Sequence, residues 1–109
     1  MAEIWISKIA VGDIKNVYES LLFVSQEHNT AENYVRDVVE HIERLKKIPK
    51  IYDLDYREAI KSLGFRSFSV RNHTVFYKYN TEKDLIEIHR IVSSFQNHIA
   101  IMIAYFREF

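Results

Sequence analysis

The sequence of 109 residues contains no cysteine, only two glycines and a single proline. Without cysteine the chain cannot form disulfides, bind zinc through thiolates or use a thiol as a nucleophile. The scarcity of glycine and proline leaves no stretch with the composition of a flexible or proline-rich linker. Together with a hydrophobic share of 48%, these absences predict a single packed domain over residues 1–109.

Long hydrophobic runs and an excess of charge of either sign are also missing. The longest apolar run, residues 99–106, is far shorter than the ~20 residues of a membrane span. The N-terminus lacks the basic and apolar regions of a signal peptide, so we expect a cytoplasmic protein that does not contact a membrane. The chain has 15 Lys and Arg against 15 Asp and Glu, a balance that argues mildly against a dedicated nucleic-acid-binding protein. The only positive excess lies in residues 63–92, with five basic and three acidic side chains.

The first half of the chain has the pattern of one strand followed by two helices. Residues 3–7 alternate apolar and polar side chains, which predicts a short strand. Apolar residues then recur every third or fourth position from about 8 to 27 and from 30 to 48, which predicts two amphipathic helices in an antiparallel hairpin. Thr30 is suited to cap the second helix and Pro49 to end it. Residues 50–62 are predicted to form a loop or one short helical turn.

From Leu63 onward the apolar period changes to two residues. This pattern predicts an antiparallel meander of three strands, the last of them over residues 85–92. The first two strands are expected to meet in a tight turn at residues 71–73, where Asn72 would tolerate a positive φ. Apolar residues from Ile99 to Phe106 predict a short C-terminal helix. The fold class is therefore α+β, with a two-helix hairpin packed on a small antiparallel sheet.

Two arginines share predicted strand faces with apolar residues that look buried. Arg66 lies in step with Phe68 and Val70, and Arg90 lies in step with Ile86 and Ile88. A guanidinium in such a place needs a partner. One interpretation is that both bind a phosphate or an acidic partner at an open end of the sheet. The other is that each forms an internal ion pair with the helical hairpin.

Three histidines, His73, His89 and His98, lie in the last third of the chain. Any of them could act as a general acid or base in RNA cleavage, with Arg71 or Arg90 stabilising the developing negative charge. The simpler interpretation is that they are surface residues on strands, and we favour it.

The sequence gives little reason to expect a metal or a cofactor. Glu87 and His89 lie two residues apart on one strand face, which could begin a metal site. No third ligand is apparent and there is no HExxH pattern, so neither a metal ion nor a cofactor is predicted.

The order of a strand, a helical hairpin and a meander resembles the RelE/ParE superfamily of bacterial type II toxins. The resemblance covers residues 3–92, and its motifs occur in the family's order and spacing. The first strand and helix contribute Ser7, Ala10, Asp13, Ile14, Val17 and Tyr18, and the second helix Ala31, Glu32, Asn33, Ile42, Leu45 and Pro49. The meander contributes Arg66, Phe68, Val70, His73, Val75, Phe76, Tyr77, Lys78, Arg90 and Ile91.

The resemblance implies a toxin that inhibits growth and is neutralised by a cognate antitoxin. It leaves two kinds of target open, and a third alternative is a degenerate toxin with no activity left. ParE-like members bind an essential protein such as DNA gyrase, whereas RelE-like members are endoribonucleases that cut mRNA on the ribosome. If this chain is an endoribonuclease, its catalytic residues are predicted to be Arg66, Arg71, His89 and Arg90.

The segment after the last strand departs from the family pattern. Relatives commonly place catalytic or target-binding Tyr, His or Arg residues there. This departure favours the ParE-like alternative. The residues found in the segment are Val92, Ser93, Ser94, Phe95 and Gln96.

The C-terminal helix is apolar nearly all round, so it must be covered. One interpretation is that it packs on the sheet. The other is that Ile99, Ile103, Tyr105 and Phe106 form a partner-binding surface, for an antitoxin or for a second copy in a homodimer. The sequence leaves both open.

Overall fold

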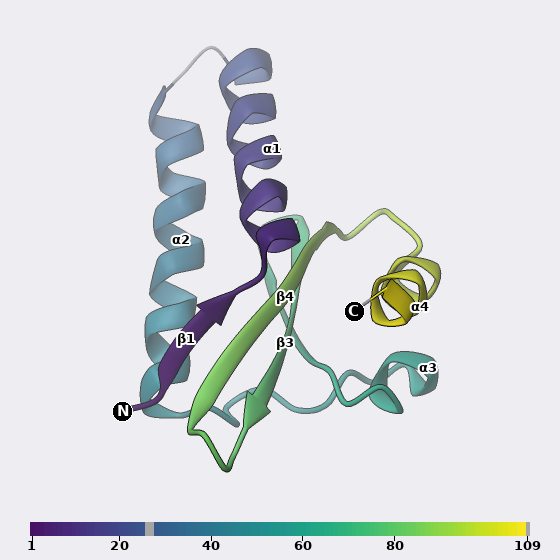
Figure 1. Ribbon diagram of the computed structural model, residues 1–109. Helices are drawn as coiled ribbons and strands as arrows, with labels where there is room; N and C mark the ends of the chain where they lie inside the picture. The colour runs from purple at the N-terminus through teal and green to yellow at the C-terminus, as the bar shows by residue number, and fades with distance from the viewer. Residues whose placement is uncertain (26–27, 109) are drawn as a thin grey trace.

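The computed structural model describes residues 1–25 and 28–108 (Figure 1). It has the predicted α+β class. Within these residues no helix combines the length and the apolar content that crossing a membrane requires. The elements in chain order are β1 (Glu3–Ile6), α1 (Lys8–Ser25), α2 (His28–Lys47), α3 (Glu58–Lys61), β2 (Arg66–Val70), β3 (His73–Asn80), β4 (Leu85–Ser93) and α4 (His98–Glu108).

The four strands form one sheet in the order β1-β4-β3-β2. β2, β3 and β4 make the predicted antiparallel meander. β1 instead runs parallel to β4, with Glu3 opposite Leu85 and Ile6 opposite Ile88. The sheet as a whole is therefore mixed, and the expectation of an antiparallel sheet holds only for the meander. Parallel neighbours need a long crossover connection, and here that connection contains the whole helical hairpin.

The two faces of the sheet are covered by different helices (Figure 1). The α1–α2 hairpin covers one face, and α3 and α4 cover the other. On the hairpin face the largest fully buried side chains are Tyr34, Val38, Leu45, Val75, Tyr77, Ile86 and Ile88. On the α4 face the buried apolar residues are Ile60, Phe65, Phe76, Val92, Met102 and Tyr105.

Local details differ from the predictions in two places. α2 begins at His28, so Thr30 lies inside its first turn and the prediction that Thr30 caps it is wrong. The positive φ in the β2–β3 turn, 54°, belongs to Arg71 and not to Asn72. α3, with four residues, is the short helical turn expected between residues 50 and 62. The predicted end of the first helix, at residue 27, lies outside the described residues.

A bulge in β4 interrupts the alternation of side chains between the two faces of the sheet. That alternation was the basis for predicting the face on which Arg90 lies. Phe76 of β3 pairs with Arg90, but its neighbour Tyr77 pairs with Ile88, so the register shifts by one residue at His89. Ile88 and Ile91, three residues apart, consequently both join the core on the hairpin face. A bulge of this kind re-aims side chains next to it, and it turns Arg90 toward the start of α1.

Candidate functional site

Arg90 is held by an acidic residue of the helical hairpin. Its Nε–H donates to Asp13 Oδ2 at 2.9 Å and its Nη2–H to Asp13 Oδ1 at 3.0 Å. The backbone N–H of Ile91 also donates to Asp13 Oδ2, at 2.9 Å. This bidentate contact is the internal ion pair with the hairpin that was one of the two interpretations of Arg90.

Arg71 and Arg66 have partners of other kinds. Arg71 Nε–H donates to Asp37 Oδ2 of α2 at 2.8 Å, in an exposed pair at the hairpin margin. Among the residues of the hairpin that the structure describes, none forms an ion pair with Arg66. Its Nη1–H donates to the carbonyl O of Tyr52 at 2.8 Å, which ties β2 to the loop after α2.

His89 lies on the other face of the sheet, beneath α4. It is 2% exposed, so it is not a surface residue. Its Nε2 lies 3.0 Å from Glu87 Oε1 and its Nδ1 lies 2.7 Å from the hydroxyl of Tyr105. Burial lowers the pKa of His89, and the neighbouring Glu87 offsets only part of that effect. The imidazole is therefore neutral near pH 7, with Nε2–H donating to Glu87 and Nδ1 accepting from Tyr105.

The four residues proposed for catalysis are thus dispersed. Arg71 and Arg90 are tied to the two helices of the hairpin, and Arg66 to the loop beside β2. His89 points to the opposite face and is enclosed by Trp5, Phe65 and Tyr105. A general base and a cation must both reach the same phosphate to cleave RNA. The described arrangement does not bring His89 and an arginine to one opening.

α4 packs on the sheet and still leaves apolar side chains outward. His98, Met102 and Tyr105 are buried, and the hydroxyl of Tyr105 donates to His89. Ile99 is 40% exposed and Phe106 46% exposed. Ile103 is half-buried beside them. The helix therefore packs on the sheet, as one of the two interpretations expected, and an apolar flank formed by Ile99, Ile103 and Phe106 stays at least partly exposed.

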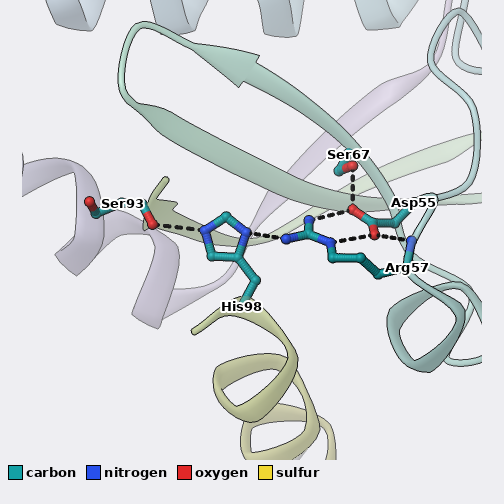
Figure 2. Close-up of polar contacts among 5 residues, drawn as sticks. All are labelled: Asp55, Arg57, Ser67, Ser93 and His98. Atoms are coloured by element: carbon teal, nitrogen blue, oxygen red, sulfur yellow. Dashed lines mark hydrogen bonds and ion pairs between the residues drawn. The ribbon is translucent and has the colours of Figure 1, made fainter. Parts of the chain in front are cut away.

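A buried polar network fixes the start of α4, and no pattern in the sequence indicated it (Figure 2). Asp55 is 1% exposed and accepts hydrogen bonds from Arg57 Nε at 2.8 Å, Arg57 Nη2 at 2.7 Å and Ser67 Oγ at 2.6 Å. Arg57 Nη1 reaches His98 Nδ1 at 2.5 Å, and His98 Nε2 reaches the carbonyl O of Ser93 at 2.7 Å. Burial alone would raise the pKa of Asp55, but the hydrogen bonds from Arg57 and Ser67 outweigh it and lower that pKa.

A groove of about 400 Å³ runs between α1 and the upper end of β4. Its walls include Asn16 and Ser20 of α1, Gln96, and the Arg90–Asp13 pair. His73 also lines it, and burial lowers the pKa of this histidine. The groove has a mixed polar and apolar lining with almost no net charge, so it suits an uncharged ligand better than a phosphate backbone.

The described residues contain no group of three or more His, Asp or Glu side chains placed to hold a metal ion. Glu87 and His89 contact each other through a hydrogen bond.

Comparisons with known proteins identify a family from the sequence and related folds among solved structures. The family model described as the ParE toxin of the type II toxin–antitoxin system parDE matches residues 4–97. No curated protein matches the chain. Among solved structures, the chromosomal ParDE system from P. aeruginosa is similar with a TM-score of 0.66 at 18% identity, covering 85% of this chain and 96% of that one. The isolated E. coli RelE toxin is similar with a TM-score of 0.55 at 10% identity, covering 95% of this chain and 96% of that one.

At these identities the two structural relatives establish the fold alone. The family model begins at the second residue of β1, includes both helices of the hairpin and the other three strands, and ends just before α4. The chain therefore belongs to the ParE toxin family of type II toxin–antitoxin systems.

Proposed function

We propose that this protein is a cytoplasmic toxin that inhibits growth by binding an essential target, in the manner of ParE, with DNA gyrase as the target. The observation that supports binding over catalysis is the separation of His89 from the three arginines. His89 is neutral, buried and enclosed by α4, whereas Arg66, Arg71 and Arg90 are bonded on the other side or at the margin of the sheet. This arrangement offers surfaces for a partner, not a pocket for phosphodiester chemistry.

The test compares two activities of the purified protein. We expect it to inhibit DNA supercoiling by purified gyrase and to leave both naked RNA and ribosome-bound mRNA intact. Full supercoiling activity at a large molar excess of the protein, together with cleavage of ribosome-bound mRNA, would reject the proposal.

A second candidate function, RelE-like cleavage of mRNA on the ribosome, is favoured by one observation. Glu87, His89 and Tyr105 form a continuous hydrogen-bonded set on the α4 face, and Lys78 stands directly across from Glu87 on β3. These are acid–base groups. If this set cleaves mRNA, His89→Gln abolishes the cleavage, whereas Arg71→Gln, at the exposed margin, leaves it unchanged.

We further propose that the cognate antitoxin contacts the outward flank of α4, which consists of Ile99, Ile103 and Phe106. Burying such side chains contributes roughly 1.5–3 kcal/mol each. The double variant Ile99→Ala, Phe106→Ala should therefore bind the antitoxin encoded beside this gene at least ~10-fold more weakly. Tyr105 is omitted from the variant because its ring belongs to the core.

Phe23→Ala is the matched control, because Phe23 is 84% exposed on α1. If the α4 variant keeps full affinity and the Phe23 variant loses it, the antitoxin binds the hairpin instead. Sedimentation of the same variants reports whether the α4 flank joins two copies in a homodimer.

A further inference from the structure

The first turn of α4 is held by hydrogen bonds that exist in only one protonation state of a histidine. His98 lies between Arg57 Nη1, 2.5 Å from its Nδ1, and the carbonyl O of Ser93, 2.7 Å from its Nε2 (Figure 2). A guanidinium only donates hydrogen bonds and a carbonyl oxygen only accepts them. Nδ1 must therefore accept and Nε2–H must donate, which makes His98 a neutral imidazole.

No group around His98 would accept a second ring proton at Nδ1. Asp55 holds Arg57 through Nε and Nη2, on the side of the guanidinium away from the imidazole (Figure 2). β3 presents the ring of Phe76, edge-on at 5.4 Å, and β4 presents the Ser93 carbonyl, which is already bonded.

The other charged groups nearby are remote from the ring. α3, which packs against α4, carries Glu58 and Lys61, and both are exposed at the surface. The charged residues of α4 itself, Arg107 and Glu108, lie at its opposite end. A proton added at Nδ1 would therefore face an N–H of Arg57, and a second positive charge would be buried beside the guanidinium.

We propose that His98 makes the docking of α4 on the sheet pH-dependent, with the helix docked while His98 is neutral and its first turn released when His98 is charged. Histidine side chains change charge between about pH 5 and 8. The docked state binds one proton fewer than the released state, so docking is strongest at higher pH. Below the titration range the docking equilibrium falls about tenfold for each pH unit.

The second histidine in contact with α4 is not expected to act in this way. His89 Nδ1 accepts from the hydroxyl of Tyr105, and a hydroxyl can donate or accept. The contact therefore survives protonation by reversing its direction, and Glu87 stays bonded at Nε2. Release exposes Phe76 and Val92 of the sheet, both of which α4 covers at neutral pH.

The experiment follows backbone amides and histidine ring protons by NMR on the full chain between about pH 7.5 and 4.5. In the wild type we expect the amides of residues 99–105 to change with the same midpoint as the ring of His98, while amides of β3 keep their positions. Unchanged α4 amides while His98 titrates would overturn the proposal. So would a loss of α4 and β3 signals at one shared midpoint.

Two variants assign the effect to the Arg57–His98 contact. His98→Gln removes the titrating group and should abolish the α4 transition. Arg57→Gln keeps His98 but offers it a side chain that can both donate and accept, so it should shift the midpoint down by at least one pH unit. This second variant tests the proposal even if His98→Gln fails to dock α4. His41→Gln, on the hairpin side of the sheet, is the control and should keep the wild-type transition; an α4 transition that survives Arg57→Gln unshifted rejects the mechanism.

Discussion

The two faces of the sheet are stabilised in different ways. On the hairpin face the buried residues are nearly all apolar, and the ion pairs Arg90–Asp13 and Arg71–Asp37 lie at its margins. On the α4 face a smaller apolar core surrounds buried polar side chains, among them Asp55. Apolar burial is non-directional, whereas a buried polar group is stable only with its partner in place. The hairpin face should therefore tolerate loss of a polar group, and the α4 face should not.

The largest expected effect comes from Asp55→Ala. The change leaves the Arg57 guanidinium partly buried without its carboxylate and removes the acceptor of Ser67. Breaking a buried pair from one side costs about 3–5 kcal/mol. Asp37→Ala breaks the exposed pair with Arg71 and should cost at most ~1 kcal/mol. Urea unfolding followed by circular dichroism measures both free energies, and equal losses would contradict the contrast between the faces.

Truncating a side chain in either apolar core should lower stability, but in different parts of the molecule. Leu45 and Met102 are both fully buried, one on each face. Changing either to Ala should cost about 2–5 kcal/mol if the whole fold depends on it. We expect Leu45→Ala to lower the global free energy of unfolding, and Met102→Ala to accelerate amide exchange mainly in α4. Equal acceleration in β3 and α4 in the Met102 variant would show that the second core is not a separate unit.

Each face also has one histidine whose pKa is lowered by burial, the half-buried His73 on the hairpin side and the buried His89 under α4. The unfolded chain binds protons near the ordinary value of ~6.5, whereas the folded chain binds them only at lower pH. The stability that these residues contribute is therefore complete above ~6.5 and is lost as the pH falls toward the lowered values. Urea midpoints at about pH 7.5 and about pH 5.5 should differ less in His73→Gln and in His89→Gln than in the wild type.

The smallest effects concern two buried tyrosine hydroxyls. Within the described residues the hydroxyl of Tyr34 has no hydrogen-bond partner, and burial, with Asp13 nearby, raises its pKa to about 12. Tyr34→Phe should leave stability unchanged or slightly higher, because it removes an unsatisfied polar group. Tyr105→Phe loses the bond to His89 and should cost about 0.5–1.5 kcal/mol. A larger loss of unfolding free energy in Tyr34→Phe than in Tyr105→Phe would contradict this prediction.

The sequence predicted the hairpin face better than the α4 face for a physical reason. Repeated apolar spacing is a local signal, and it located α2, its end near Pro49 and the three strands of the meander. The bulge at His89 has no such signal, so the facing of Arg90 was inferred from an alternation that the structure interrupts. The parallel pairing of β1 likewise depends on residues far away in the chain.

In the candidate site too, some features follow from local sequence patterns and others depend on contacts between distant residues. The sequence showed that the C-terminal helix is apolar nearly all round but not which of its residues the sheet covers, and the structure leaves Ile99 and Phe106 partly exposed. The contact between Arg57 and His98 joins residues 41 positions apart. The sequence around Arg57 and around His98 looks the same whether these side chains are buried in a network or exposed to solvent. Only the three-dimensional structure therefore identifies the network.

The parallel pairing of β1 with β4 also has a consequence for synthesis. Ser7, directly after β1, donates to the carbonyl of His89, 82 residues later, and β1 has no other strand as a neighbour. At about 5–20 residues per second, the ribosome takes several seconds to make the segment that β1 needs. During that time the hairpin helices can form from local contacts, but the sheet cannot close. Contacts this distant in the chain slow folding, so the nascent toxin acquires its native surface only after β4 has been made.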